Sequence, residues 1–316
     1  MSGHVLTFGE TMGLFRTAEV GDLADVDTAR IATGGADSNV AIGLSRLGIR
    51  SVWVGRVGDD GVGRRIVRDI RGQGVVAHPI VDRDAPTGIM LKEKPTPHTT
   101  RVWFYRAGSA GSRIRPDDIE PSLVEDAALV HVTGITASIS RSGLDTVREV
   151  LRRARGAGVP VSFDVNHRAS LWRSGEAADV YRELAASADT VFAGEDEAAL
   201  LTAAPADEPQ TLVTAMSALG PAVAVLKRGA RGSMAREGSA VIERPALTVP
   251  VVDTVGAGDA FVAGFLAARL RGRPTEECLE LGAAAGAFAC MGPGDWESLP
   301  RTEDLALLES NDPVSR

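Results

Sequence analysis

Short apolar runs alternate with longer segments of helical periodicity along most of this 316-residue chain. Runs typical of strands lie at residues 5–9, 52–57, 128–132, 159–164, 189–192 and 223–227. Helical patterns lie at residues 36–48, 62–73, 142–156, 175–187, 196–203, 210–219 and 259–271. Strands that are apolar throughout are expected to be buried on both faces, and β-then-α alternation favours a parallel sheet between helices. We therefore expect an α/β fold with a doubly wound, mostly parallel sheet and helices on both faces.

Two stretches break this alternation. Residues 10–33 contain no convincing helical pattern, and residues 86–112 alternate in short bursts between prolines and glycines. Both are typical of β-rich insertions outside the main sheet, either as a small sheet that covers a cleft or as surface hairpins without a function. With these insertions included, the length suits a single domain over residues 1–316.

Charge and hydropathy exclude several classes of partner. The formal net charge of -8 lacks the basic footprint of a nucleic-acid binder. No apolar run is long enough to cross a bilayer, and the N-terminus does not have the pattern of a signal peptide. We therefore expect a cytoplasmic protein with neither a nucleic-acid nor a membrane partner. Cys278 and Cys290 lie in apolar, alanine-rich stretches, which predicts buried free thiols.

The most specific chemical signal lies in residues 253–265, which read DTVGAGDAFVAGF. Gly256, Ala257 and Gly258 form a turn of small residues, and Asp259 follows at the start of a helical pattern. A helix start leaves backbone N–H groups unpaired and carries a positive dipole end, and glycines let a ligand approach the backbone. The segment therefore suits a phosphoryl group, with Asp259 either as a general base or as a plain helix cap.

The string DTVGAGDAF at 253–261 resembles the signature near the C-terminus of the ribokinase-like (PfkB) sugar kinases. The resemblance implies a ribokinase-like fold with a small β-sheet lid. It also implies that Asp259 is the catalytic base and that the amides of Gly256, Ala257 and Gly258 form the anion hole for the transferring phosphoryl group. The chain has no P-loop motif and no complete GxGxxG pattern, which disfavours a P-loop protein and a dinucleotide enzyme.

A second segment, GGADSNVAIGLSRLG at 34–48, resembles the N-terminal signature of the same family. The backbone N–H groups of Gly34 and Gly35 can approach sugar hydroxyls. Asn39 offers both a donor and an acceptor, and Asp37 is a further candidate to bind a hydroxyl. Taken alone, the two glycines would indicate a turn and Asp37 a helix cap. Together with the first signature, the segment implies that Gly34, Gly35 and Asn39 bind the sugar.

Three segments between the two signatures resemble those of the 2-keto-3-deoxygluconate kinases within this family: FYRAGSAGS at 104–112, VTGITASIS at 132–140 and SFDVNHRASLW at 162–172. Arg106 and Arg168 stand where the resemblance places substrate-binding arginines, and a guanidinium group matches a carboxylate. Ordinary surface arginines are the alternative. Met90 and Phe104 stand where close relatives carry pocket tyrosines, so the exact sugar acid and its stereochemistry stay open.

On the nucleotide side, the string VLKRGARGS at 225–233 resembles the family's element beside the ATP phosphates. Lys227 then approaches the phosphates, with a solvated strand end as the alternative. A later helix of small residues gives an adenine ring room to enter. The nucleotide-binding residues implied in this way are Lys227, Gly229, Gly232, Gly256, Gly258, Ala283 and Gly286.

The resemblance also concerns metal ions. The string AGEDEAAL at 193–200 corresponds to the family's Asn-x-x-Glu element, which helps to hold Mg²⁺ through water. Glu197 matches the glutamate, whereas Gly194 replaces the asparagine. Asp253 and the loop at 292–294 can frame a monovalent cation such as K⁺, as in some relatives.

The resemblance implies an enzyme that transfers the γ-phosphoryl group of ATP to the terminal hydroxyl of 2-keto-3-deoxygluconate, with Asp259 as the base. Three alternatives remain: another ribokinase-like kinase such as a fructokinase, a non-catalytic sugar sensor of the same fold, and a dinucleotide enzyme. A homo-oligomer is a further expectation from the resemblance, because relatives often pair through the lid sheet.

Overall fold

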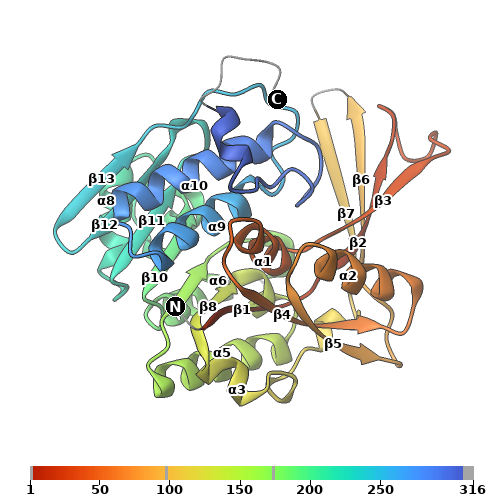
Figure 1. Ribbon diagram of the computed structural model, residues 1–316, viewed down its shortest axis with the longest axis horizontal. Coiled ribbons are helices and arrows are strands. Elements are labelled where there is room, and N and C mark those ends of the chain that lie inside the picture. Colours follow the sequence, from red (N-terminus) through yellow and green to blue (C-terminus); the bar gives the residue numbers. More distant parts are fainter. Residues whose placement is uncertain (1–2, 97–98, 173–174, 309–316) are drawn as a thin grey trace.

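The computed structural model describes residues 3–96, 99–172 and 175–308. Nine strands form the main sheet, in the order β13-β12-β11-β10-β9-β8-β1-β4-β5 (Figure 1). Seven neighbouring strands run parallel: β1 (His4–Phe8), β4 (Ser51–Gly58), β5 (Val76–Asp82), β8 (Ala127–Thr133), β9 (Val161–Asp164), β10 (Thr190–Gly194) and β11 (Val223–Lys227). In the middle, the wholly buried Leu6 pairs with Val52 on one side and Val130 on the other. The mostly parallel sheet is confirmed.

Strands at both edges of this sheet were not predicted. Strand β5 contains Pro79, which cannot donate a ladder hydrogen bond and is tolerated because β5 is an edge strand. At the other edge, β12 (Ser233–Glu237) and β13 (Ala240–Arg244) form an antiparallel hairpin. Strand β12 is mostly buried and β13 mostly exposed, but both have mixed sequences that lack the continuous apolar run of the central strands.

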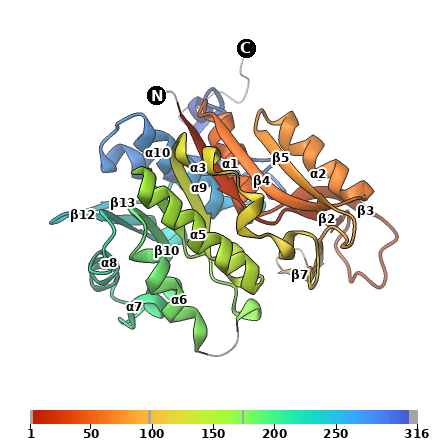
Figure 2. The ribbon, with the colours of Figure 1, turned by 90° about the horizontal axis from the view of Figure 1, so that it is seen from below.

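Helices cover both faces of the sheet, as Figure 2 shows. One apolar cluster packs helices α1 (Ala36–Arg46), α9 (Ala257–Leu270) and α10 (Thr275–Cys290) on the sheet, and α2 (Gly61–Gly72) packs beside them. Another cluster covers the opposite face with α5 (Arg141–Ala157), α6 (Glu176–Ala185), α7 (Glu195–Thr202) and α8 (Pro209–Ser217). The short helices α3 (Pro121–Glu125) and α4 (Gly134–Ser138) contact α5. The doubly wound architecture is therefore confirmed.

Local sequence signals place these helices. Asp60 caps α2 by accepting the Gly63 N–H at 2.7 Å, and Ser140 caps α5 by accepting the Gly143 N–H at 2.9 Å. Short 3₁₀ turns complete the chain: η1 (Gly111–Arg113), η2 (Pro116–Asp118), η3 (Ala169–Leu171), η4 (Gly229–Arg231) and η5 (Asp304–Leu308). In the described part of the chain, no helix combines the length and hydropathy needed to span a membrane.

The two insertions come together in a second, mixed sheet with the order β3-β2-β6-β7 (Figure 1). It contains β2 (Met12–Thr17), β3 (Ala29–Gly34), β6 (Ile89–Thr96) and β7 (Thr99–Tyr105), and residues 97–98 lie outside the described part. Met12, Leu14, Ala32 and Met90 form its small apolar cluster. The insertions are thus one sheet and not two separate surface hairpins.

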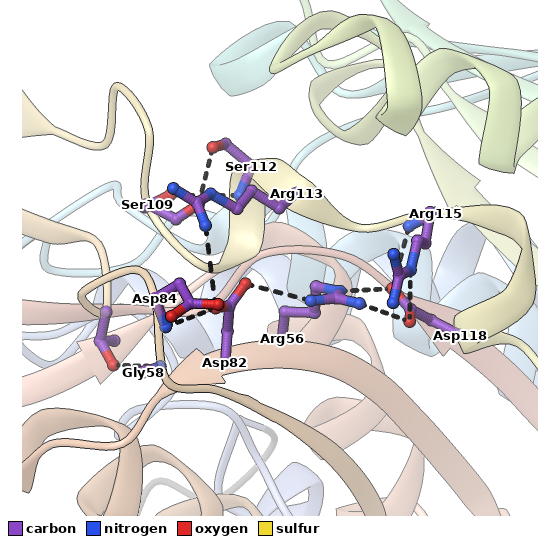
Figure 3. Close-up of polar contacts among 10 residues, drawn as sticks. Arg56, Gly58, Asp82, Asp84, Ser109, Ser112, Arg113, Arg115 and Asp118 are labelled. Carbon is purple, nitrogen blue, oxygen red and sulfur yellow. Dashed lines mark hydrogen bonds and ion pairs between the residues drawn. The ribbon is translucent and has the colours of Figure 1, made fainter.

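A buried ion-pair network ties the segment after this small sheet to the main sheet (Figure 3). Arg56 of β4 donates to Asp82 at the end of β5 at 3.1 Å. The same guanidinium group donates to both oxygens of Asp118 in η2, at 2.6 and 2.9 Å. All three side chains are nearly buried, so removal of one partner would leave an uncompensated charge. The network therefore fixes the path of the chain as it leaves the small sheet.

Candidate active site

Gly256 makes the turn that leads into α9. Its φ is +77°, and a Cβ there would lie 2.0 Å from the carbonyl oxygen of Asp295, so the position requires glycine. The N–H of Ala257 donates to the carbonyl of Thr254 at 3.3 Å and is partly engaged in the turn. The first turn of a helix otherwise offers free N–H groups and a positive dipole end. The turn at Gly256 and Gly258 therefore has the character of an anion-binding position.

Asp259 is the third residue of α9, and Gly256 is the N-cap, so the plain-cap interpretation of Asp259 is wrong. The Asp259 Oδ2 atom accepts a hydrogen bond from Asn39 Nδ2 at 2.8 Å. Asn39 Oδ1 in turn accepts the Gly35 N–H at 3.5 Å. Burial raises the pKa of Asp259, and the hydrogen bond from Asn39 opposes that shift. A fixed carboxylate with a raised pKa is well suited to accept a proton near neutral pH.

Two cavities meet at this turn, and both are lined by Lys227, Thr254 and Gly258. The larger has a volume of about 950 Å³ and the smaller about 490 Å³. The predicted residues that line the larger cavity are Gly34, Gly35, Asn39, Phe104, Arg106, Arg168, Lys227, Gly256, Gly258 and Asp259. Those that line the smaller are Lys227, Gly229, Gly232, Ala257, Gly258, Ala283 and Gly286. The fold therefore gathers segments from the whole chain around one helix turn.

The small sheet forms one wall of the larger cavity. Met12 and Leu14 of β2, Met90 and Lys92 of β6, and Phe104 of β7 line it. Met90 is buried and Phe104 is half-exposed. Neither side chain carries a hydroxyl, so this wall is apolar where the two replaced tyrosines would stand.

Arg106 enters the larger cavity from the end of β7 and is held by Glu10. Its Nε atom donates to Glu10 Oε2 at 2.7 Å, and Glu10 is wholly buried. The hydroxyl of Ser109 donates to the other oxygen of Glu10. Glu10 also lines the cavity and follows strand β1 at the carboxyl edge of the sheet. Glu10 therefore orients the guanidinium group of Arg106 at the cavity wall.

Arg168 lies on the exposed rim of the larger cavity, after strand β9. Its Nη1 atom donates to the carbonyl of His167 at 2.9 Å. His167 packs edge-on against Tyr181, with ring centroids 5.7 Å apart, and bonds to the tyrosine hydroxyl at 3.1 Å. His167 therefore has a packing role in this loop, and Arg168 is the residue that faces the cavity.

Lys227 ends strand β11 between the two cavities. Its Nζ atom donates to Asp164 Oδ1 at 2.6 Å, and Asp164 ends strand β9. Burial disfavours the charged form of Lys227, but the neighbouring carboxylates of Asp164 and Glu197 raise its pKa overall. The interpretation of Lys227 as a solvated strand end is therefore wrong, because its ammonium group is fixed and charged beside the Gly258 turn.

Glu197, the residue expected to help hold Mg²⁺, lies outside both cavity linings. Its Oε2 atom accepts the Gly194 N–H at 2.6 Å at the start of α7. Its Oε1 atom accepts the His167 N–H at 2.8 Å. Glu197 thus caps a helix and fixes the loop that carries Arg168. Among the described residues, no group of three or more His, Cys, Asp or Glu side chains is arranged to hold a metal ion.

The smaller cavity has the character of a slot for a flat apolar ring. Leu247, Val249 and Val251 form one wall, and Ala283 and Ala287 of α10 form another. Gly229 and Gly232 bring the backbone of the β11–β12 turn to its mouth. The two cysteines are free, with Cys278 buried and Cys290 half-buried at the cavity edge.

Sequence reasoning missed several charged residues of the larger cavity. Glu10 and Asp164 both stand at the carboxyl end of a parallel strand. Ligands of such sheets bind at that edge, so this position could have indicated both residues from the sequence. Lys92 gave no local signal, because its partner Asp253 lies 161 residues away in the sequence. Asp295 lies in an irregular loop that only the fold brings to the cavity. Asp37, considered as a sugar ligand, is instead buried away from the cavity, and its Oδ2 accepts the Thr136 hydroxyl at 2.9 Å.

Comparison with known proteins adds independent findings. The pfkB family carbohydrate kinase model matches residues 2–302. The 2-dehydro-3-deoxygluconokinase of Bacillus subtilis is 36% identical over 315 residues, which covers 98% of this chain and 96% of that protein. The 2-dehydro-3-deoxygalactonokinase of Haloferax volcanii is 33% identical over 313 residues, which covers 99% of this chain and 98% of that protein.

A solved structure extends the similarity to three dimensions. The fructokinase of Xylella fastidiosa, crystallised with bound ATP, superimposes with a TM-score of 0.86 at 25% identity. The match covers 98% of each chain. The arrangement of sheets and helices described above is therefore shared with a sugar kinase along essentially its whole length.

Proposed function

The chain belongs to the pfkB family of carbohydrate kinases, and from this premise we propose that it phosphorylates 2-keto-3-deoxygluconate (2-dehydro-3-deoxygluconate) with ATP. The products are ADP and 2-keto-3-deoxy-6-phosphogluconate. The observation that carries this proposal is the position of Asp259 where the two cavities meet, with Arg106 and Arg168 in the larger one.

The mechanism follows from this position. The sugar acid occupies the larger cavity and ATP the smaller. Asp259, held by Asn39, takes the proton of the 6-hydroxyl. That oxygen then forms a bond to the γ-phosphorus while the bond to the β-phosphate oxygen of the departing ADP breaks. Positioning and charge stabilisation are most of what phosphoryl transfer requires. The amides of Gly256 and Gly258 and the ammonium group of Lys227 supply that stabilisation.

The nucleotide site is proposed from the apolar slot and from the relatives. Adenine fits between the β-branched and leucine side chains on one side and the alanines of α10 on the other. The triphosphate then points past Lys227 to the Gly258 turn, which both cavities share. The fructokinase with bound ATP supports this placement at the level of the fold.

Magnesium fits this site as an ion carried largely by ATP. Mg²⁺ prefers oxygen ligands and keeps several waters, so phosphate oxygens and water can supply most of its shell. Glu197 lies close enough to Lys227 to help raise the pKa of its ammonium group. We propose that Glu197 reaches the ion through water. When bound, Mg²⁺ neutralises charge on the phosphates.

The sugar-acid specificity rests on the two arginines. A guanidinium group keeps further donors when one carboxylate is already bound to it, and a substrate carboxylate can take these donors in charge-assisted hydrogen bonds that a neutral sugar cannot match. Glu10 already holds Arg106 in place, which reduces the ordering cost on binding. The gluconate and galactonate forms differ in configuration at one carbon. The apolar wall at Met90 and Phe104 contacts the sugar but offers no hydroxyl that would distinguish the two configurations.

A substrate panel tests the proposal. A coupled ADP assay compares 2-keto-3-deoxygluconate, 2-keto-3-deoxygalactonate, fructose and ribose in the wild type and in Arg106→Ala. We expect the sugar acid to be preferred and Arg106→Ala to lower its kcat/KM by roughly 10- to 100-fold, the value of a charged hydrogen bond. The loss for fructose should be smaller, because fructose is affected only by the unpaired Glu10 that the substitution leaves at the cavity wall. Arg101→Ala is the matched control, because Arg101 lies on the same strand and is exposed.

The panel also separates the alternatives. A faster reaction with fructose and an equal loss for all substrates in Arg106→Ala would indicate a fructokinase. Failure to produce ADP with every sugar would indicate a sensor.

We further propose a homo-oligomer. Strand β7 is an exposed edge strand, and Trp103 and Tyr105 are among its exposed residues. Light scattering at several concentrations tests this proposal.

A further inference from the structure

Lys92 is a buried lysine in the middle of strand β6. Its side chain is 2% exposed, and its Nζ atom donates to Asp253 Oδ2 at 2.7 Å. Lysine is seldom buried to this degree unless it is paired. The pair spans 161 residues of sequence and joins the small sheet to the segment that precedes α9. It therefore connects two walls of the larger cavity.

Asp253 is the anchor of the turn that carries the proposed anion hole. Its Oδ1 atom accepts the Val255 N–H at 3.2 Å, and its own N–H and that of Val252 donate to the carbonyl of Cys290. Three residues later, the Gly256 backbone packs against Asp295. The turn is thus held at Asp253 and at Gly256, and the ammonium group of Lys92 balances the charge of Asp253.

The charges around Lys92 explain why a cation is needed here. Asp253, Asp295 and Asp259 are close enough to interact electrostatically, and the charge of Lys92 acts on Asp253 and Asp295. Without the ammonium group of Lys92, the buried carboxylate of Asp253 would lose its ion-pair partner and keep only the weaker influence of Lys94, which is unfavourable. A monovalent cation at Asp253 is the arrangement that the family resemblance implied. The residues do not fit that ion, because the ammonium group of Lys92 already pairs with Asp253 Oδ2, and Asp253 Oδ1 accepts the Val255 N–H.

We propose that Lys92 is a positioning residue that takes the place of a monovalent cation, so that the anion-hole turn is set by the protein's own ammonium group. This inference rests on the proposed kinase function, because the turn matters only if it receives a phosphoryl group. The chain then needs no K⁺, and the small sheet and the turn at Gly256 are linked through one ion pair.

Replacing the side chain tests the proposal in two ways. Lys92→Ala removes the ammonium group and opens space for a small cation. The matched control is Arg101→Ala, because Arg101 is an exposed cation on the neighbouring strand β7. Kinase activity is measured at constant ionic strength in potassium, ammonium or tetramethylammonium chloride. We expect equal wild-type rates in all three salts. In tetramethylammonium chloride, Lys92→Ala should lose on the order of 100-fold in kcat, the effect of a misplaced group, and K⁺ or NH₄⁺ should restore part of it.

Thermal unfolding of the same proteins, without substrate, supplies a readout independent of activity. The melting temperature of Lys92→Ala should rise with K⁺ or NH₄⁺ but not with tetramethylammonium, and the wild type and Arg101→Ala should show no such selectivity. Failure of the kinase proposal would leave this thermal result intact. K⁺ activation of the wild type, or a Lys92→Ala protein with unchanged kcat and no cation response, would overturn the proposal.

Discussion

At the residue scale, cations of the larger cavity are fixed by carboxylates from other elements before a ligand arrives. Glu10 holds Arg106 and Asp253 holds Lys92, while Asp164 holds Lys227. Such pairs orient a charge without removing its remaining donors. The cavity is therefore preorganised for an anionic substrate and an anionic phosphoryl group, and little side-chain ordering remains to be done on binding.

Asp295 is the cavity carboxyl whose titration should affect stability. Burial raises its pKa from 3.8 to about 7, although Lys92 opposes the shift. A carboxyl whose pKa is raised in the folded state contributes stability below its unfolded pKa and loses that contribution as the pH rises through the folded pKa. We expect the free energy of unfolding of Asp295→Asn to increase relative to that of the wild type as the pH rises from 4 to 8. The gain should reach about 4 kcal/mol at most, since one pKa unit corresponds to about 1.4 kcal/mol.

Urea unfolding of both proteins at several pH values measures this gain. The difference between the two proteins is the quantity to follow, because the titration of other groups, including Asp37, is common to both. A difference that stays constant from pH 4 to pH 8 would contradict the assignment of a raised pKa to Asp295.

At the element scale, the position of Asp259 depends on how α9 packs against α10. Gly264 lies at their contact, where a Cβ would meet the Leu281 carbonyl oxygen at 2.6 Å and the Ala285 Cβ at 3.0 Å. Phe265, one residue on, stacks edge-on against Phe192 of β10 with ring centroids 5.1 Å apart. Helix α9 is therefore fixed both to its neighbour and to the sheet, and the proposed base is carried on its first turn.

Gly264→Ala should disturb this helix contact. A methyl group cannot be accommodated without moving α9 from α10, and overpacking of this kind costs roughly 1–3 kcal/mol. We expect a lower melting temperature together with a lower kcat, because the shift is transmitted to Asp259. The control is Gly156→Ala near the end of α5, where a Cβ meets open space and no loss is expected. Equal stability of the two variants would refute the close contact.

At the scale of the whole molecule, the central strands and both helix layers could be predicted because they are apolar and regularly spaced. The edge strands could not, since β5 carries Pro79 and the short strands β12 and β13 mix apolar with charged residues. Within the site, two motifs located Asp259 and the glycines around it. The contact between Asn39 and Asp259 joins residues 220 apart, and Lys92 of the small sheet pairs with Asp253 in the segment that precedes α9. Such pairings depend on the tertiary fold and leave no local pattern in the sequence.

The central claim is that Asp259 takes the proton of the attacking hydroxyl, and Asp259→Asn tests it most directly. The substitution keeps the shape of the side chain and an oxygen for the Asn39 amide, so folding and ligand affinity should be close to those of the wild type. Rapid-quench measurement of a single turnover, with saturating ATP and sugar acid, should show phosphoryl transfer slowed by about 10²- to 10⁴-fold. A single-turnover rate near that of the wild type would contradict the account.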